Sequence, residues 1–213
     1  ETAVASIADA EGTPGMPFEA RKAQAIVTRS YLAGARNRHS GYDFCDAEHC
    51  QLMKGIPHET SDAARATALT RGQVVTYKGD VVPTLYSASC GGHTKTLAQS
   101  KWMGAAFPQP GYPYFSVSCP LQGRAKGHGV GMCQLGSMEI AKHGYSAQII
   151  LSHYFPNTVI ETQETGTRKA ASAAVPSKVA PAAIPTTATK IAPVRPPVRT
   201  LAVNAGMGAH VAP

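Results

Sequence analysis

The sequence predicts a mixed α+β fold: a single domain with a central buried helix, a β-hairpin and short C-terminal helices, followed by a disordered tail. The central helix follows Pro17, and at about 100° per residue its small and apolar residues fall on two opposite sides, which indicates burial on both. The hairpin is indicated by VVTY, KGD and VVPTLYS between residues 74 and 87. The tail is indicated by a change in composition.

That change in composition divides the chain into a domain at 1–163 and a tail at 164–213. Ala and Pro dominate the tail, which has no aromatic residue and no acid after Glu164. Such a segment cannot bury enough apolar surface to order itself. We therefore expect one folded domain followed by a basic, disordered tail.

The formal net charge is +7, but most of the excess lies in the tail, where six basic residues are scattered. The domain itself is nearly neutral, so binding of nucleic acid is not expected. No apolar run approaches the roughly 20 residues that a membrane span requires, so no span is expected. The chain starts at Glu1 without Met, which is typical of a mature form or a fragment.

The elements of the domain follow from local signals, beginning with a short helix over 1–10 that leads into Glu11. The turn GTPG comes next, and Pro17 suits the first turn of the central helix because proline needs no hydrogen-bond partner for a backbone N–H there. This helix should end between Gly34 and Arg36. The helix thus follows closely after Glu11 in the sequence.

A second helix is expected over 61–71, with Thr60 or Ser61 as its N-cap and Gly72 at its end. The hairpin comes next, and Pro83 places its second strand at a sheet edge or a bulge because proline cannot donate a ladder hydrogen bond.

Three short elements complete the domain. We expect a helix over 134–142 closed by Gly144, a helix over 147–154 capped by Ser146, and a last strand at TVIE.

The irregular stretch 37–59 is too long for an ordinary connection unless something fixes it, and it contains His39, Cys45, His49 and Cys50. Zinc prefers four nitrogen or sulfur ligands, and a loop without a core gains order from such a clip. With all four ligands the ion has no open position, so its role would be structural. The alternative is a disulfide between the two cysteines, as in exported proteins.

Two glycine-rich stretches carry further candidates: SASCGGHT at 87–94 and GHGVGMCQ at 127–134. Glycine lets the backbone turn sharply or approach a ligand closely, and a helix N-terminus after the second stretch supplies amide donors. A dinucleotide site is excluded because this stretch does not follow a strand in a βαβ unit.

The residues alone leave several interpretations open. Cys90 could pair with Cys119, and a thiol hydrolase could use Cys133 with His128 as its base. Glu11, a carboxylate before a Gly/Pro turn, is more often a helix-end or surface acid than a catalytic group. The pattern alone therefore predicts an α+β domain, clipped by a metal, with two glycine-rich loops that meet at a site.

Four blocks in order over residues 1–161 resemble the SpoIID/LytB (stage II sporulation protein D) family. EGTPGMPFEARKAQAIVTRSYL resembles its Glu followed by E-A-x-K-A-Q-A and A-R-[ST]-Y, and SASCGGHT resembles its S-x-C-G-G-x-T. GHGVGMCQLGS resembles G-H-G-V-G-M-[SC]-Q-x-G-A, and IILSHYFPNTVI resembles the closing I-L-x-x-Y-Y-P.

The resemblance implies a peptidoglycan lytic transglycosylase, a glycan-cleaving lyase of the cell wall in sporulation. Such an enzyme cuts the β-1,4 bond between N-acetylmuramic acid and N-acetylglucosamine in peptide-free glycan strands and leaves 1,6-anhydro ends. Glu11 falls on the family's catalytic Glu, which acts as acid and then as base. An extracytoplasmic location, in the periplasm or cell wall, is implied, and we expect a monomer.

The resemblance also implies site residues. The His and Cys group within 39–50 resembles the zinc site of some members, which makes zinc the expected structural cofactor. Lys22 and Arg29 would form a cationic wall behind Glu11 and favour its ionised form. The residues expected to bind the glycan are Lys22, Gln24, Arg29, Tyr31, Ser89, His128 and Gln134.

One alternative function within the same family stays open, a non-catalytic, glycan-binding enhancer of a cell-wall amidase. That function needs a groove for the glycan but no acid. Its partners would be the glycan strands and the amidase.

Overall fold

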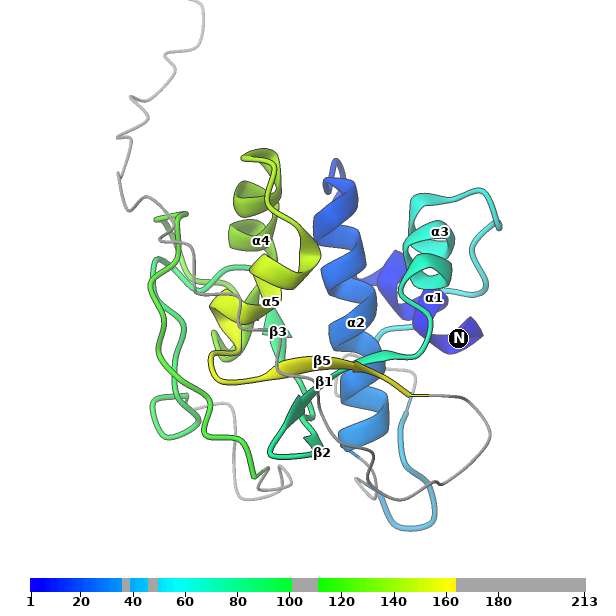
Figure 1. Cartoon of the computed structure of the whole chain (residues 1–213), viewed down its shortest axis with the longest axis horizontal. Coiled ribbons are helices and arrows are strands. Elements are labelled where there is room, and N and C mark those ends of the chain that lie inside the picture. The colour runs from blue at the N-terminus through cyan, green and yellow to red at the C-terminus, as the bar shows by residue number, and fades with distance from the viewer. Residues whose placement is uncertain (36–38, 46–49, 101–110, 164–213) are drawn as a thin grey trace, which may run out of the picture.

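A computed structural model describes residues 1–35, 39–45, 50–100 and 111–163. The tail predicted at 164–213 lies outside these ranges, as does the predicted ligand His49. Within the described residues, five helices and two small sheets form the domain (Figure 1). The prediction of a mixed α+β fold is therefore confirmed.

Each described helix falls where the sequence predicts one, and the ends agree to within about three residues, which is the usual precision of helix boundaries. The helices are α1 (Thr2–Ala10), α2 (Phe18–Gly34), α3 (Asp62–Leu69), α4 (Gln134–Lys142) and α5 (Ala147–Tyr154).

Two of the predicted helix caps are formed by serine side chains. The Ser61 hydroxyl accepts a hydrogen bond from the Ala64 N–H at 3.2 Å, and the Ser146 hydroxyl accepts one from the Ile149 N–H at 3.4 Å. Each cap satisfies an N–H that the helix itself leaves without a partner, and a cap of this kind stabilises a helix by about 1 kcal/mol.

Helix α2 is the centre of the domain (Figure 1). Helices α1 and α3 pack on one side of it and α4 and α5 on the other, while β1 crosses it. Ala20, Ala23, Ile26 and Val27 are fully buried along its length. The predicted burial on two sides is therefore confirmed, and the alanines allow the neighbouring helices to approach closely.

The larger sheet has the order β2-β1-β5, with all pairs antiparallel. Lys78 and Gly79 join β1 to β2 with φ of 54° and 88°, which is a type I′ hairpin turn. Strand β5 pairs with the other edge of β1. The strands are β1 (Gln73–Tyr77), β2 (Asp80–Val81) and β5 (Val159–Thr162).

The second hairpin strand is much shorter than the sequence predicts. Strand β2 ends at Val81, and the backbone at Pro83 packs against the end of α2, where a Cβ on Gly34 would lie 2.8 Å from the Pro83 nitrogen. Proline lacks the N–H that would continue the ladder with β1. The remainder of the predicted strand joins a different sheet.

That second sheet pairs β3 (Tyr86–Ser87) with β4 (Met132–Cys133) in parallel. The pairing places the glycine-rich stretches 87–94 and 127–134 side by side. Gly131 makes the approach possible, because at its φ of 74° a Cβ would lie 2.1 Å from the Leu85 carbonyl oxygen. In the part of the chain that the structure describes, no helix is long and apolar enough to cross a membrane.

Candidate functional site around Glu11

Glu11 is the residue at which α1 ends. Its N–H donates to the Ile7 carbonyl at 2.8 Å, and its partly buried side chain accepts a hydrogen bond at Oε1 from the Leu52 N–H at 3.0 Å. A helix C-terminus carries partial negative charge, so it disfavours a carboxylate charge, whereas the Leu52 N–H stabilises that charge. The Leu52 hydrogen bond thus holds the Glu11 carboxylate at the end of α1.

Two buried glutamines connect Glu11 to the centre of the domain. The side-chain amide of Gln134, the first residue of α4, donates to the Glu11 carbonyl at 2.8 Å and to Gln24 Oε1 at 3.2 Å. Gln24 in turn donates to the Thr28 hydroxyl at 3.4 Å. Both glutamines are at most 5% exposed. The structure therefore brings these two predicted site residues together with Glu11.

Tyr86 supplies a phenolic hydroxyl at the same place. It donates to Gln51 Oε1 at 2.5 Å and also hydrogen-bonds to Thr28. Burial raises the pKa of Tyr86 well above its usual value, and the charge of Glu11 and the nearby Tyr31 hydroxyl raise it further. Tyr86 therefore stays neutral and can donate a hydrogen bond beside the carboxylate.

Lys22 and Arg29, the two cations predicted to form a wall behind Glu11, are each paired with another carboxylate. The Lys22 ammonium lies 2.6 Å from a Glu19 carboxylate oxygen on the same face of α2. The Arg29 guanidinium makes a bidentate pair with Glu1, at 2.6 and 3.0 Å, and also donates to the Gln73 and Thr67 carbonyls. Helical spacing alone did not reveal the partners of Arg29, because they lie outside α2.

Tyr31 and His128 are held by the fold. The Tyr31 ring is buried and lies 5.8 Å from the Phe44 ring. His128 Nδ1 accepts from the Val130 N–H at 3.0 Å, and the ring also hydrogen-bonds to the backbone of Tyr86. Burial lowers the pKa of His128. Its ring therefore ties the second glycine-rich loop to β3 as a neutral group.

Ser89 lines a groove of about 470 Å³ together with two cations, Arg124 and Lys126, and the apolar residues Ala88 and Leu135. Ser89 and Lys126 exchange backbone hydrogen bonds of 3.1 and 2.8 Å, which fixes one wall. Leu135 directly follows the Glu11-bonded glutamine of α4. The groove is thus attached to the first turn of the helix that contacts Glu11.

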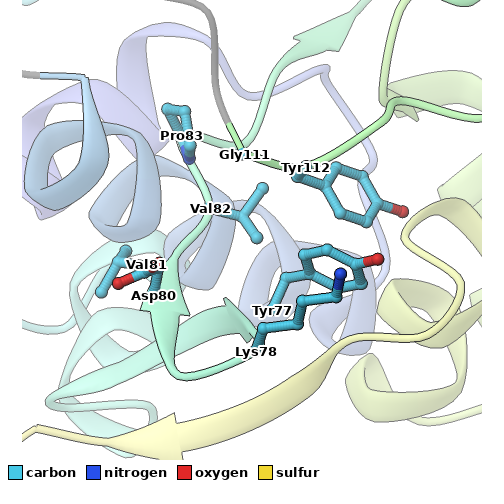
Figure 2. A pocket seen from close by; sticks show the side chains of 8 residues that line it. All are labelled: Tyr77, Lys78, Asp80, Val81, Val82, Pro83, Gly111 and Tyr112. Atoms are coloured by element: carbon cyan, nitrogen blue, oxygen red, sulfur yellow. The ribbon is translucent and has the colours of Figure 1, made fainter.

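A second cavity of about 240 Å³ lies at the hairpin and is lined by none of the predicted site residues. Figure 2 shows the rings of Tyr77 and Tyr112 side by side on one wall, with Lys78 beside Tyr77. The two ring centroids are 5.3 Å apart in an edge-to-face arrangement, and the Tyr112 hydroxyl donates to the Pro156 carbonyl. These contacts are typical of packing between a hairpin and a loop.

Three of the four predicted metal ligands lie together. His39 Nε2 is 3.0 Å from Cys50 Sγ, and the ligand atoms of His39, Cys45 and Cys50 all lie within 4.8 Å of one another. Zinc–ligand bonds of about 2.0–2.3 Å place two ligands of one ion within such distances, so the donor set fits zinc. No disulfide joins Cys45 and Cys50 in the structure, so the alternative pairing of these two cysteines is not formed.

The other cysteines contradict two of the open interpretations. Cys90 and Cys119 are free thiols as well. Cys133 is 1% exposed, and hydrogen bonding with Cys119, burial and the neighbouring thiolate charge raise its pKa. A buried thiol with a raised pKa cannot attack a polymer, which argues against a thiol hydrolase.

Sequence reasoning missed Tyr86, Thr28 and Gln51 as members of the site. Tyr86 directly precedes SASCGGHT, and Thr28 lies one turn after Gln24 on α2. Periodicity could have suggested Thr28, because residues four apart share a helix face. No local signal marks Gln51, whose position depends on the fold of the His and Cys loop.

The fold and the site define a small α+β domain in which the Glu11 carboxylate lies at a junction of helices, with Leu52, Gln134 and Tyr86 beside it. The model of the family described as SpoIID, Stage II sporulation protein, matches residues 1–77. This match confirms the resemblance that the motifs predict and supports assignment of the chain to the SpoIID family. That description is of a sporulation protein, and the matched region covers 77 of the 213 residues.

One relative of known sequence is an uncharacterized protein of Brachyspira hyodysenteriae. It is 32% identical over 104 residues, a region that covers 47% of this chain and 28% of that protein. The matched region thus spans less than a third of the relative's length.

Proposed function

We propose that this domain is a peptidoglycan lytic transglycosylase that acts outside the cytoplasm on glycan strands without stem peptides. The observation that carries the proposal is the Glu11 carboxylate, which accepts a hydrogen bond from the Leu52 N–H, while Gln134 holds the Glu11 backbone and a neutral tyrosine lies nearby. A hydrolase of the usual kind needs two carboxylates flanking the bond. A transglycosylase needs one, because the sugar itself supplies the nucleophile.

In the proposed reaction, Glu11 first gives its proton to the oxygen of the β-1,4 bond, and the bond from that oxygen to the anomeric carbon of N-acetylmuramic acid breaks. The C6 hydroxyl of the same sugar then attacks the anomeric carbon, and Glu11 takes the hydroxyl proton. A 1,6-anhydro ring forms, no water is consumed, and Glu11 returns to its protonated form. One group can serve both steps because the two protons move in sequence.

The polar residues around Glu11 would position it. The helix end favours the protonated carboxyl that the first step needs, and the Leu52 N–H stabilises the carboxylate that the second step needs. Tyr86 would hold Gln51, the neighbour of Leu52, through the hydrogen bond that it donates, without changing its own charge. Gln24 and Gln134 would hold the backbone of Glu11 in place.

The groove along Ser89, Arg124 and Lys126 would bind the glycan strand. A muramic acid residue without its stem peptide carries a free lactyl carboxylate. Two cations at the groove match that charge, and the apolar side chain of Leu135 offers a surface for a sugar face. The groove therefore supports a preference for peptide-free strands.

The zinc expected at His39, Cys45 and Cys50 would have a structural role, with His49 as the predicted fourth ligand. With four protein ligands the ion would order the loop and would have no open position for water. The loop runs directly into Gln51 and Leu52, which contact Tyr86 and Glu11.

The test compares wild type with Glu11→Gln on peptide-free glycan strands, with mass spectrometry of the products. Wild type should release anhydro-ended sugars, and Glu11→Gln should lower the rate at least about 100-fold because acid–base catalysis is lost. Glu161→Gln, which alters an exposed acid on β5, is the matched control and should keep full activity. Unchanged release of anhydro-ended sugars by Glu11→Gln would refute the proposed transglycosylase activity.

The same groove favours the second candidate, a glycan-binding enhancer of a cell-wall amidase, because binding needs the cations but not the acid. Wild type would then bind strands without releasing anhydro ends. It would stimulate the amidase, and Glu11→Gln would stimulate equally while Lys126→Ala would not.

A further inference from the structure

Three thiols meet in the core beside the α4 N-terminus. Cys90 comes from the loop after β3, Cys119 from the stretch before the second glycine-rich loop, and Cys133 from β4. Their Sγ atoms all lie within 4.8 Å of one another, and each residue is at most 5% exposed. Three distant segments of the chain thus converge on one small volume.

Each sulfur accepts a hydrogen bond from a backbone N–H. Cys133 Sγ accepts from the N–H groups of Cys90 and Gly136, both at 3.4 Å. Backbone hydrogen bonds also reach Cys119 from Leu121 and Cys90 from Gly92. Amide donors stabilise negative charge on sulfur, which a core thiol packed as a small apolar side chain does not require. The three sulfurs are therefore in contact with backbone amide donors as well as with one another.

A glycine in α4 also leaves space for the three sulfurs. Gly136 lies within α4, where glycine costs about 1 kcal/mol relative to alanine. A Cβ at this position would lie 2.4 Å from Cys119 Sγ and 2.1 Å from the Tyr154 hydroxyl oxygen. The Tyr154 hydroxyl lies 3.4 Å from the same sulfur. Only a residue without a side chain leaves room for the thiols.

Without a cation the three sulfurs cannot all ionise, because like charges at this distance repel strongly in a buried site. A metal cation bound between the sulfurs would offset that repulsion and let all three act as thiolate ligands.

We propose that Cys90, Cys119 and Cys133 bind one thiophilic metal ion, at a site separate from the His39 group. Soft thiolate ligands select ions such as Cu(I) and Zn(II) over oxygen-preferring cations. Metal–sulfur bonds of about 2.3 Å place the sulfurs of one ion roughly 4 Å apart, within the spacing found here. The described ligands are all sulfur, which favours Cu(I), an ion that accepts three thiolates without a fourth ligand.

Such an ion would join three segments that local structure does not connect. It would fix the first turn of α4, because Cys133 is the N-cap and Gln134 begins the helix. The site would therefore also stabilise the glutamine that contacts Glu11, although its own function would be structural.

The test uses the full chain carrying Cys45→Ser and Cys50→Ser, which removes both sulfurs of the first group. Native mass spectrometry after separate anaerobic loading with Cu(I) and with Zn(II) should find one ion per chain with at least one of the metals. A thiolate-to-metal charge-transfer band should accompany it. The ion bound more tightly in competition with a chelator identifies the natural occupant. No bound ion with either metal in a folded protein would overturn the proposal.

Two further measurements locate the site. Adding Cys119→Ser to the same background should abolish the ion and the band, and Gly136→Ala should weaken binding at least about tenfold by crowding the sulfurs. Should the triple variant not fold, the unmodified chain still decides, since it should carry two ions rather than one. A disulfide between two of these cysteines, found by thiol labelling of freshly denatured protein, would refute the metal site.

Discussion

The side-chain amide of Gln134 donates a 2.8 Å hydrogen bond to the backbone carbonyl of Glu11, a residue 123 positions earlier in the chain. The same nitrogen donates to Gln24 Oε1 at 3.2 Å. The first residue of α4 thus connects the last turn of α1 to the centre of α2. The position of the candidate acid depends on this contact between distant segments, and the contact can be tested directly.

We expect Gln134→Ala to lower both stability and activity. The change leaves the buried Gln24 amide oxygen without this donor, which costs about 1–3 kcal/mol. It also releases the Glu11 backbone, so the rate of anhydro-sugar release should fall while strand binding persists. Urea unfolding and the digestion assay measure the two effects. Gln148→Ala, an exposed position on α5, should change neither, and equal losses in both variants would contradict the role given to Gln134.

Tyr86→Phe removes a hydroxyl that stays protonated because burial and the Glu11 charge raise its pKa. The rate of strand cleavage should fall about tenfold, which corresponds to one hydrogen bond of about 1.4 kcal/mol. Because Tyr86 does not ionise below its raised pKa, the alkaline side of the pH–rate profile should have the same shape in both proteins. If the wild-type rate falls near pH 10 and this fall is absent in Tyr86→Phe, Tyr86 ionises there, which would contradict its role as a neutral group. Tyr145→Phe, at a partly buried tyrosine between α4 and α5, is the control.

The helices were predictable because their signals are local. Ser61 and Ser146 cap helices that begin at the next residue, and the small residues of α2 indicate burial on two sides. The division of the second hairpin strand was not predictable, because Tyr86 leaves the hairpin to pair with Met132, 46 positions further on. Such pairing depends on the whole fold rather than on sequence periodicity.

The residues of the candidate site were predictable only where they fall on a position of a family motif. Glu11, Gln24 and Gln134 came from motif resemblance, and the structure brings them together. Arg29 came from the same motifs, yet its charge is matched by Glu1 at the start of α1. Charge on a helix wheel does not reveal a partner from another element, so the prediction of a cationic wall did not include the pair of Arg29 with Glu1.

The pair of Arg29 and Glu1 makes a prediction for stability against pH. Burial alone would raise the pKa of Glu1, but the hydrogen bond and charge of Arg29, with the Gly72 N–H, outweigh it and lower the pKa below 4.5. A lowered folded-state pKa stabilises the protein above about pH 4.5, and this stabilisation is lost as pH falls further.

Wild type should therefore be more stable than Glu1→Gln at neutral pH, and the difference should shrink as pH falls below about 4.5. Arg29→Gln should cost about 2 kcal/mol at neutral pH, because it leaves a partly buried carboxylate without its partner. Thermal and urea unfolding across pH measure both. Arg65→Gln breaks an exposed pair with Asp62 and should cost less than about 0.5 kcal/mol. A pH-independent difference for Glu1→Gln would refute the linkage.

Removal of the zinc proposed for the His39 group should affect both stability and activity, because the loop continues directly from Cys50 into Gln51 and Leu52. Their contacts with Tyr86 and Glu11 make the loop part of the site. A metal present at 100 times its dissociation constant adds about 3 kcal/mol of stability, so chelation should lower Tm by roughly 5–10 °C. His39→Ala should have the same effect without chelator, and adding zinc should not restore it. His58→Ala alters an exposed histidine of the neighbouring segment and should leave Tm and metal content unchanged. Cleavage of glycan strands, measured well below Tm, separates the loss of activity from the loss of stability. If the chelated protein stays folded and cleaves at the full rate, the loop does not position Glu11.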